Sequence, residues 1–286
     1  TSGGSLSIQS DGAVAVDAGA KLDVSGGSVA YQPGTLKRSL LRAGNQWTPI
    51  DRASADTRYE ELGNSKARTD VGTAVFQTVQ VPGYVEGKDA GQATVAGRRV
   101  YLAGAVNGQT VVGPNQDGRR SAATPVAGGL TVGRQRVTDS SLADVVIRPN
   151  VSDQRPDALF ANPTGADADA ALSTIATVAT NGVQGGGIGR LTLYAANAVK
   201  MDAGISLDLG VGGSLRIQTN GIDLAGRVRA AGGSISLTTL PVGESGSGIA
   251  LRSGSELDVS GTWSNDNVPL GVAGRALAGL VSTAGG

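Results

Sequence analysis

The chain has 286 residues, of which 45 are glycine and only 3% are aromatic, and 24 basic residues balance 24 acidic ones. This balance argues against a nucleic-acid partner, which would require a basic excess, and no run reaches the ~18 apolar residues of a membrane span. Cysteine and histidine are both absent, which excludes disulfides and thiolate metal sites and removes the commonest general base.

Residues 1–31 contain the first predicted strands, at 5–8, 13–16, 21–24 and 28–31. Each run alternates apolar and polar residues, which is typical of a strand with one buried face. Glycine or Ser-Gly closes these runs, as in "KLDVSG" (21–26), and glycine allows the chain to turn sharply. The phrase returns as "SLDLG" (206–210) and "ELDVSG" (256–261). The chain therefore repeats a unit made of a short strand and a tight corner.

Two stretches interrupt this pattern. Residues 32–92 carry most of the bulky side chains and are interpreted as an insertion between coils, after which strands and a polar loop fill 93–152. The second insertion covers 153–182. Its segment "DADAALSTIATVATNG" (167–182) begins with Asp and ends in Asn-Gly, which predicts a short amphipathic helix lying on the coils. Residues 183–286 return to strands and end in a C-terminal extension.

Equivalent strands recur every 20 to 24 residues, as from Leu191 to Leu215 and from Leu215 to Ile235. Three short strands fill each interval, and a repeat of this length is typical of a solenoid. We therefore expect an all-β parallel β-helix of about eight to ten coils, each adding ~4.8 Å. A β-sandwich or antiparallel meander is the alternative, because Asn-Gly and Asp-Gly pairs suit hairpins. The predicted inward ladder consists of Leu191, Leu193, Val199, Met201, Leu207, Leu209, Leu215, Ile217, Ile222, Leu224, Val228, Ile235 and Leu237.

Four phrases together carry a family resemblance: "AGAKLDVSGGSVAYQPG", "GIGRLTLYAANAVKM", "DLAGRVRAAGGSISL" and "LDVSGTWSND". They resemble the repeats of the filamentous haemagglutinin family, large exoproteins of Gram-negative bacteria that are exported by two-partner secretion. The resemblance implies a right-handed β-helical shaft with adhesive function, secreted or held at the cell surface. The implied partners are an outer-membrane two-partner secretion transporter and a host receptor, glycan or biofilm matrix.

The family's amino-terminal secretion domain, with its "NPNG" signature, does not occur in this sequence, so transporter recognition is assigned to none of its residues. The chain opens with "GGSLSIQ" (3–9) and closes with "STAGG" (282–286), and internal "GG" pairs stand directly before strands. These boundaries predict an internal segment of a longer polypeptide.

Asp23, Asp208 and Asp258 recur at one position of the repeated phrase. They predict either a carboxylate row for calcium or lyase chemistry, or outward side chains between two inward ones, as is usual for charged residues. No calcium-loop pattern is present. The segment "GGGIGR" (185–190) precedes a strand instead of following one, so it indicates a corner and not a dinucleotide site. We expect no catalytic residue, no metal and no cofactor.

Candidate partner-binding residues are Trp47, Arg58, Tyr59 and Tyr84, because Trp, Tyr and Arg are enriched in interface hot spots. Alternatively, the aromatic side chains form a small core of the insertion itself. The expected function is an adhesive shaft. A stalk that presents a toxin domain in contact-dependent inhibition and a β-helical polysaccharide-active enzyme are the alternatives. The absence of histidine and of a convergent acid cluster argues against the enzyme.

Overall fold

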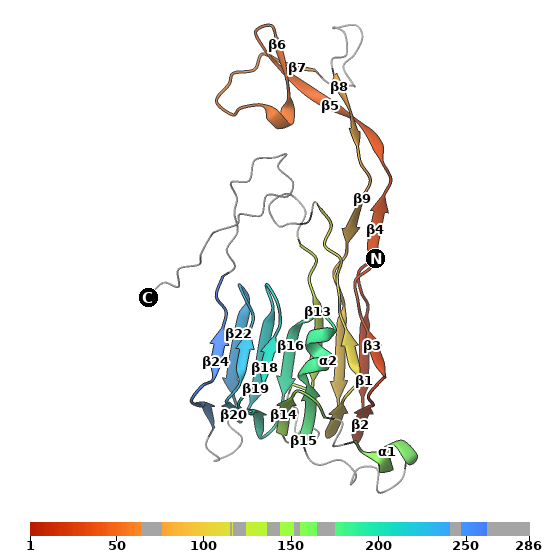
Figure 1. Cartoon of the computed structure of the whole chain (residues 1–286), viewed down its shortest axis with the longest axis vertical. Helices are drawn as coiled ribbons and strands as arrows, with labels where there is room; N and C mark the ends of the chain where they lie inside the picture. Colours follow the sequence, from red (N-terminus) through yellow and green to blue (C-terminus); the bar gives the residue numbers. More distant parts are fainter. Residues whose placement is uncertain are drawn as a thin grey trace.

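The computed structural model describes residues 1–63, 76–114, 116, 124–135, 144–151, 155–164, 175–240 and 247–261. Over these residues the fold is all-β and has two parts (Figure 1), a body of parallel sheets and a long antiparallel arm. Two α-helices of five and six residues occur in the described ranges. Neither is long and apolar enough to cross a membrane.

The first face of the body is a parallel sheet of six strands. In spatial order these are β1 (Ser5–Gln9), β10 (Gln92–Ala96), β13 (Gly128–Val132), β16 (Ile188–Tyr194), β19 (Ser214–Thr219) and β22 (Ser234–Thr239). Strands that are far apart in sequence pair in register, so that Leu191 lies beside Leu215 and Leu215 beside Ile235. Apolar side chains therefore stack from strand to strand along this face.

The second face is a parallel sheet of seven strands. Their order is β2 (Ala13–Val16), β11 (Arg99–Leu102), β15 (Ile175–Ala179), β14 (Asp144–Arg148), β17 (Ala198–Met201), β20 (Gly221–Leu224) and β23 (Gly248–Leu251). The third face has two shorter sheets. One pairs β3 (Lys21–Asp23) with β12 (Ala105–Asn107), and the other orders β18 (Ser206–Asp208), β21 (Arg227–Arg229) and β24 (Glu256–Asp258). The chain visits the three faces in turn, as in β19, β20 and β21.

Helix α2 (Thr180–Gly185) accounts for the division of the third face. It follows β15 in the chain and contacts β12 on one side and β18 on the other, where a strand of the third face would otherwise lie. The prediction of a helix over 167–182 is wrong for residues 175–179, which form β15, while 165–174 lie outside the described residues. Ile175, Thr177 and Val178 are β-branched, and such side chains favour a strand over a helix.

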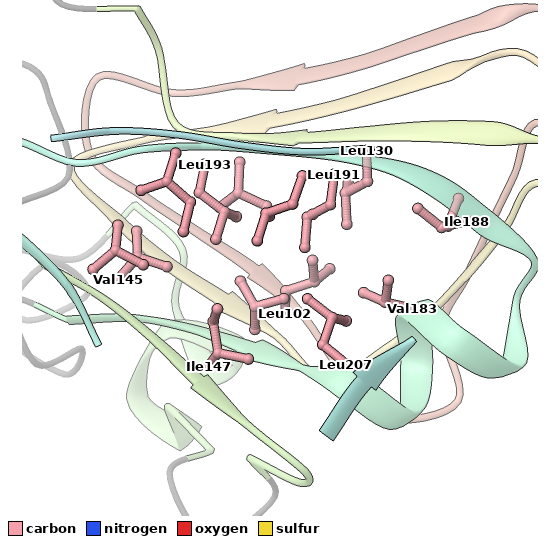
Figure 2. Packing of buried hydrophobic residues seen from close by; sticks show 14 of the residues in the cluster. Leu102, Leu130, Val145, Ile147, Val183, Ile188, Leu191, Leu193 and Leu207 are labelled. Carbon is pink, nitrogen blue, oxygen red and sulfur yellow. The ribbon is translucent and has the colours of Figure 1, made fainter. Parts of the chain in front are cut away.

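The core lies between the three faces, where aliphatic side chains point toward one another (Figure 2). The predicted ladder is confirmed: all its members are buried except Ile235 and Leu237, which are half-buried on the last strand of the first face. The described residues form sheets of six and seven strands, and eight to ten coils for the whole chain stays a prediction. Outside the sheets of the body lies α1 (Asp157–Ala161), whose Leu159 packs with Tyr101 and Val151 apart from the main core.

The arm is a long antiparallel ribbon that ends in a small outer sheet, in which residues 40–43 pair with residues 46–49 and 61–63 (Figure 1). Its elements are β4 (Ser28–Tyr31), β5 (Gly34–Ala43), β6 (Gln46–Pro49), the 3-10 turn η1 (Ile50–Arg52), β7 (Glu61–Gly63), β8 (Phe76–Val81) and β9 (Tyr84–Gly87). β4 pairs with β9, and β5 continues the same register with β8. The segment 28–31, grouped with the coils in the sequence analysis, thus begins the arm.

Candidate functional site

The four candidate partner-binding residues all lie on the arm, but the structure does not bring them into one cluster. Trp47 is half-buried in β6, directly opposite Arg42 of β5. Tyr59 is half-buried in the segment before β7, where its hydroxyl accepts a 2.9 Å hydrogen bond from the Ser54 N–H, and Arg58 beside it is exposed. Tyr84 belongs to β9, on the ribbon between the outer sheet and the body.

Charged side chains surround Trp47 in the outer sheet. Arg42 Nε donates a 2.8 Å hydrogen bond to Glu61 Oε2, and its Nη1 lies 3.7 Å from the Glu60 carboxylate. Residues directly opposite in an antiparallel pair share a face, so Trp47, Arg42 and Glu61 lie on one face of the sheet. These ion pairs are partly exposed, and each contributes ~0–1 kcal/mol at most. Trp47 therefore lies beside a guanidinium group and its carboxylate partners.

Tyr84 stacks against Tyr31 across the ribbon. The ring centroids lie 4.7 Å apart with an interplanar angle of 21°, and the two residues are directly paired in β4 and β9. Tyr31 is 42% exposed, so the stack presents an aromatic surface to solvent. This pair holds the two strands together at a point where the ribbon has no third strand among the described residues.

The arm buries no hydrophobic side chain completely. None of the buried hydrophobic residues lies in the described ranges 28–63 and 76–87, whereas the body contains them on every face. Instead, Leu36, Ile50 and Leu62 are 60%, 51% and 54% exposed. These side chains are apolar surface with no buried hydrophobic residue beneath them in the described part of the arm, and a two-stranded ribbon without a core is marginally stable in water.

Gln116 fixes the root of the arm to the body. Its side chain is buried, and its Oε1 accepts hydrogen bonds from the N–H groups of Gly87 (2.7 Å) and Gly113 (3.1 Å). Its Nε2 donates to the Gly87 carbonyl at 2.9 Å. The amide therefore satisfies both backbone groups of Gly87, the last residue of β9. No sequence signal distinguishes Gln116 from the other polar residues of its loop.

The three repeated aspartates are corner residues. Their carboxylates accept hydrogen bonds of 2.8–2.9 Å from the N–H two residues later, which belongs to Ser25, Gly210 and Ser260 in turn. This is an Asx turn, which tightens the corner after each strand.

Arg229 stands between Asp208 and Asp258 on the third face, 3.4 Å from each carboxylate. The hydrogen bond from the Ser25 N–H lowers the pKa of Asp23, and hydrogen bonds from Ser260 lower the pKa of Asp258. The carboxylates are therefore paired and do not converge on an open site. No group of three potential metal ligands occurs in the described residues.

The segment "GGGIGR" connects α2 to β16, so here a helix precedes a strand, the reverse of a dinucleotide loop. Gly187 adopts a φ of 71°, which favours glycine at this corner. A hollow of about 430 Å³ lies beside it, and Asp208 is the one ionisable residue among those that line it. A single carboxylate provides no acid–base pair.

Comparisons with known proteins give no match: no family model, no curated protein and no solved structure is similar to this chain. In the described part of the chain, the arm is the feature that departs most from the regular body, and it exposes apolar and aromatic side chains without a buried hydrophobic core of its own.

Proposed function

We propose that this chain is an adhesive shaft segment of a large secreted bacterial exoprotein of the filamentous haemagglutinin type. In this proposal the three faces of the body form a right-handed parallel β-helix. The in-register parallel pairing of equivalent strands supports it, because each unit of three strands packs on the next. Crossovers between parallel strands of one sheet are right-handed in about 98% of cases.

The arm is the observation that carries the adhesive function. Residues 28–43 run in one direction along it, and at ~3.3 Å per residue they extend about 50 Å. Its outer end presents Trp47, Arg58 and Tyr59 together with exposed Leu62. A scaffold that is rigid and regular, with an irregular projection rich in interface residue types, is suited to contact with a cell-surface protein, glycan or matrix.

Family resemblance supplies the remaining parts of the proposal. It implies export through an outer-membrane two-partner secretion transporter and a location outside the cell or at its surface. The body itself acts as a spacer: the pairing of its faces leaves few distinguishing features from one unit to the next, so contact is concentrated on the arm.

Deletion of the outer part of the arm tests this function. Gly34 and Val81 are directly paired, so removing residues 35–80 and joining these two by a short Asn-Gly turn leaves β4, β9 and the Gln116 contacts in place. We expect an unchanged melting temperature of the body and loss of adhesion to cells or matrix. Adhesion at the parent level would reject the role of the arm.

Point variants refine the test. Trp47→Ala and Tyr59→Ala should each reduce adhesion, since truncation of an aromatic hot-spot residue costs ~2 kcal/mol or more of binding. Phe160→Ala is the matched control, because Phe160 is an exposed aromatic residue of α1, away from the arm, with 36% of its surface accessible. Equal loss in the control would indicate a nonspecific effect and contradict the assignment to the arm.

A further inference from the structure

The outer edge of β8 is unpaired among the described strands. β8 pairs with β5 along Gly34–Ser39 through its other edge. Its sequence, Phe-Gln-Thr-Val-Gln-Val, contains no charge and no proline over six residues. A strand edge of this kind is a template for pairing with another chain, and proteins usually protect such edges with charges or prolines.

The opposite side of the ribbon is protected in these ways. Arg38 of β5 lies 3.2 Å from Asp51, and η1 contacts β5 on the way to β7. β6, the other outer strand of the outer sheet, ends in Pro49. The asymmetry between a protected edge and an unprotected one singles out β8 as the pairing edge of the arm.

We propose that β8 pairs antiparallel with β8 of a second copy of this chain, about a two-fold axis at Val79. Directly paired residues share a face of the sheet, whereas neighbouring residues of one strand point to opposite faces. A two-fold axis perpendicular to the sheet must therefore lie where a residue is paired with the same residue of the second copy. With the axis at Val79, Thr78 lies opposite Gln80 of the second copy, and Gln77 lies opposite Val81.

The cross-strand neighbours favour this register. Leu36 is directly opposite Val79 within one copy, so the axis creates a row of four apolar residues, Leu36 and Val79 from each copy, across four strands. Leu36 is 60% exposed and Val79 is half-buried in the single chain, and the row places both on a common apolar face. Lys37 lies opposite Thr78 of its own copy, so no like charges face each other across the new pair.

The consequence is a four-stranded sheet formed from two arms, with the two bodies on either side of it. The interface is small, so we expect a weak dimer that forms in the micromolar range and not an obligate one. This inference is independent of the adhesive function, since it concerns the ribbon edge and not the residues around Trp47.

A charge-swap experiment tests the pairing. Sedimentation equilibrium of the parent from about 1 µM to about 1 mM, the range of a weak interface, should show a monomer–dimer equilibrium. Val79→Lys and Val79→Glu should each shift the protein to monomer, because like charges directly opposite are destabilising. An equimolar mixture of the two variants should recover the dimer. Recovery requires the two 79 positions to face each other, which separates loss of pairing from misfolding of the arm.

A crosslinking experiment gives a second readout. The chain has no cysteine, so Val79→Cys introduces a single thiol, and facing residues of an antiparallel pair are within disulfide reach. Mild oxidation should give a covalent dimer, whereas the matched control Thr35→Cys, on the protected strand, should remain monomeric. A monomeric parent at all concentrations, a mixture of variants that stays monomeric, or dimers that persist in both charged variants would overturn the proposal.

Discussion

Replacement of Gln116 by leucine should release the root of the arm. The buried amide makes three hydrogen bonds, two to N–H groups of Gly87 and Gly113 and one to the Gly87 carbonyl. Leucine has a similar volume but leaves these three backbone groups unpaired, and Gly87 and Gly113 are both buried. An unsatisfied buried group costs ~1–3 kcal/mol. Water entering at the root relieves part of this cost, so the low end of the range applies, about 3 kcal/mol in total.

The loss should be local, and amide hydrogen exchange measures it residue by residue. A change of about 3 kcal/mol corresponds to roughly 100-fold faster exchange at Gly87, while amides of the body such as that of Leu215 keep their protection. Gln9→Leu is the matched control: Gln9 is exposed and its side chain bonds only to Ser7 in the described residues. Unchanged protection at Gly87 would refute the assignment of Gln116 as the residue that fixes the arm.

Three further perturbations act on the body. Leu215→Asp should abolish cooperative unfolding near the parent melting temperature in calorimetry, since it buries an unpaired charge in the ladder, whereas Asp258→Asn should lower stability at neutral pH by a much smaller amount. Hydrogen bonds from Ser260 lower the pKa of Asp258 below the usual Asp value of 3.8. The ionised carboxylate therefore stabilises the fold at pH values above 3.8, and this contribution is lost as pH falls through the lowered pKa of the folded state. The free energies of unfolding of the parent and Asp258→Asn, measured in urea, should therefore converge at acid pH. A difference between them that grows at acid pH would contradict this sign. Gly233→Ala should lower the melting temperature because its Cβ would overlap the Gly213 carbonyl, whereas Gly248→Ala, with open space around it, should not.

The strands of the body were predictable because their periodicity is local. Leu215 and Ile217 alternate with polar residues in β19, as Ile235 and Leu237 do in β22, whereas β11 and β14 carry consecutive apolar residues. The repeated aspartate was also interpretable from sequence as an outward residue. Its hydrogen bond to the N–H two residues later was not predicted, although Asx turns have a recognisable pattern of Asp before Ser or Gly.

The arm was predictable only as an insertion. Nothing in "SVAY" (28–31) distinguishes a strand of the ribbon from a strand of the body, because its direction depends on pairing with β9, more than fifty residues later. The helix predicted over 167–182 failed for a similar reason: Ile175–Ala179 is placed between β11 and β14, and this non-local pairing outweighs the local Ala-rich pattern. Gln116 depends entirely on tertiary contact with Gly87.

The unequal number of strands on the faces has a geometric consequence for the body. At ~4.8 Å between neighbouring strands, the six strands of the first face cover about 24 Å and the seven of the second about 29 Å. The additional strand, β15, leads into α2, and a helix with its side chains is ~10 Å wide, about two strand spacings. The second face, through β15, and the third face, through α2, are thus both lengthened at the same point along the body. At this point the first face shows a register irregularity between β13 and β16. We expect the body to bend toward the first face at this level, so that one insertion sets the angle between the units that carry the arm and those that follow.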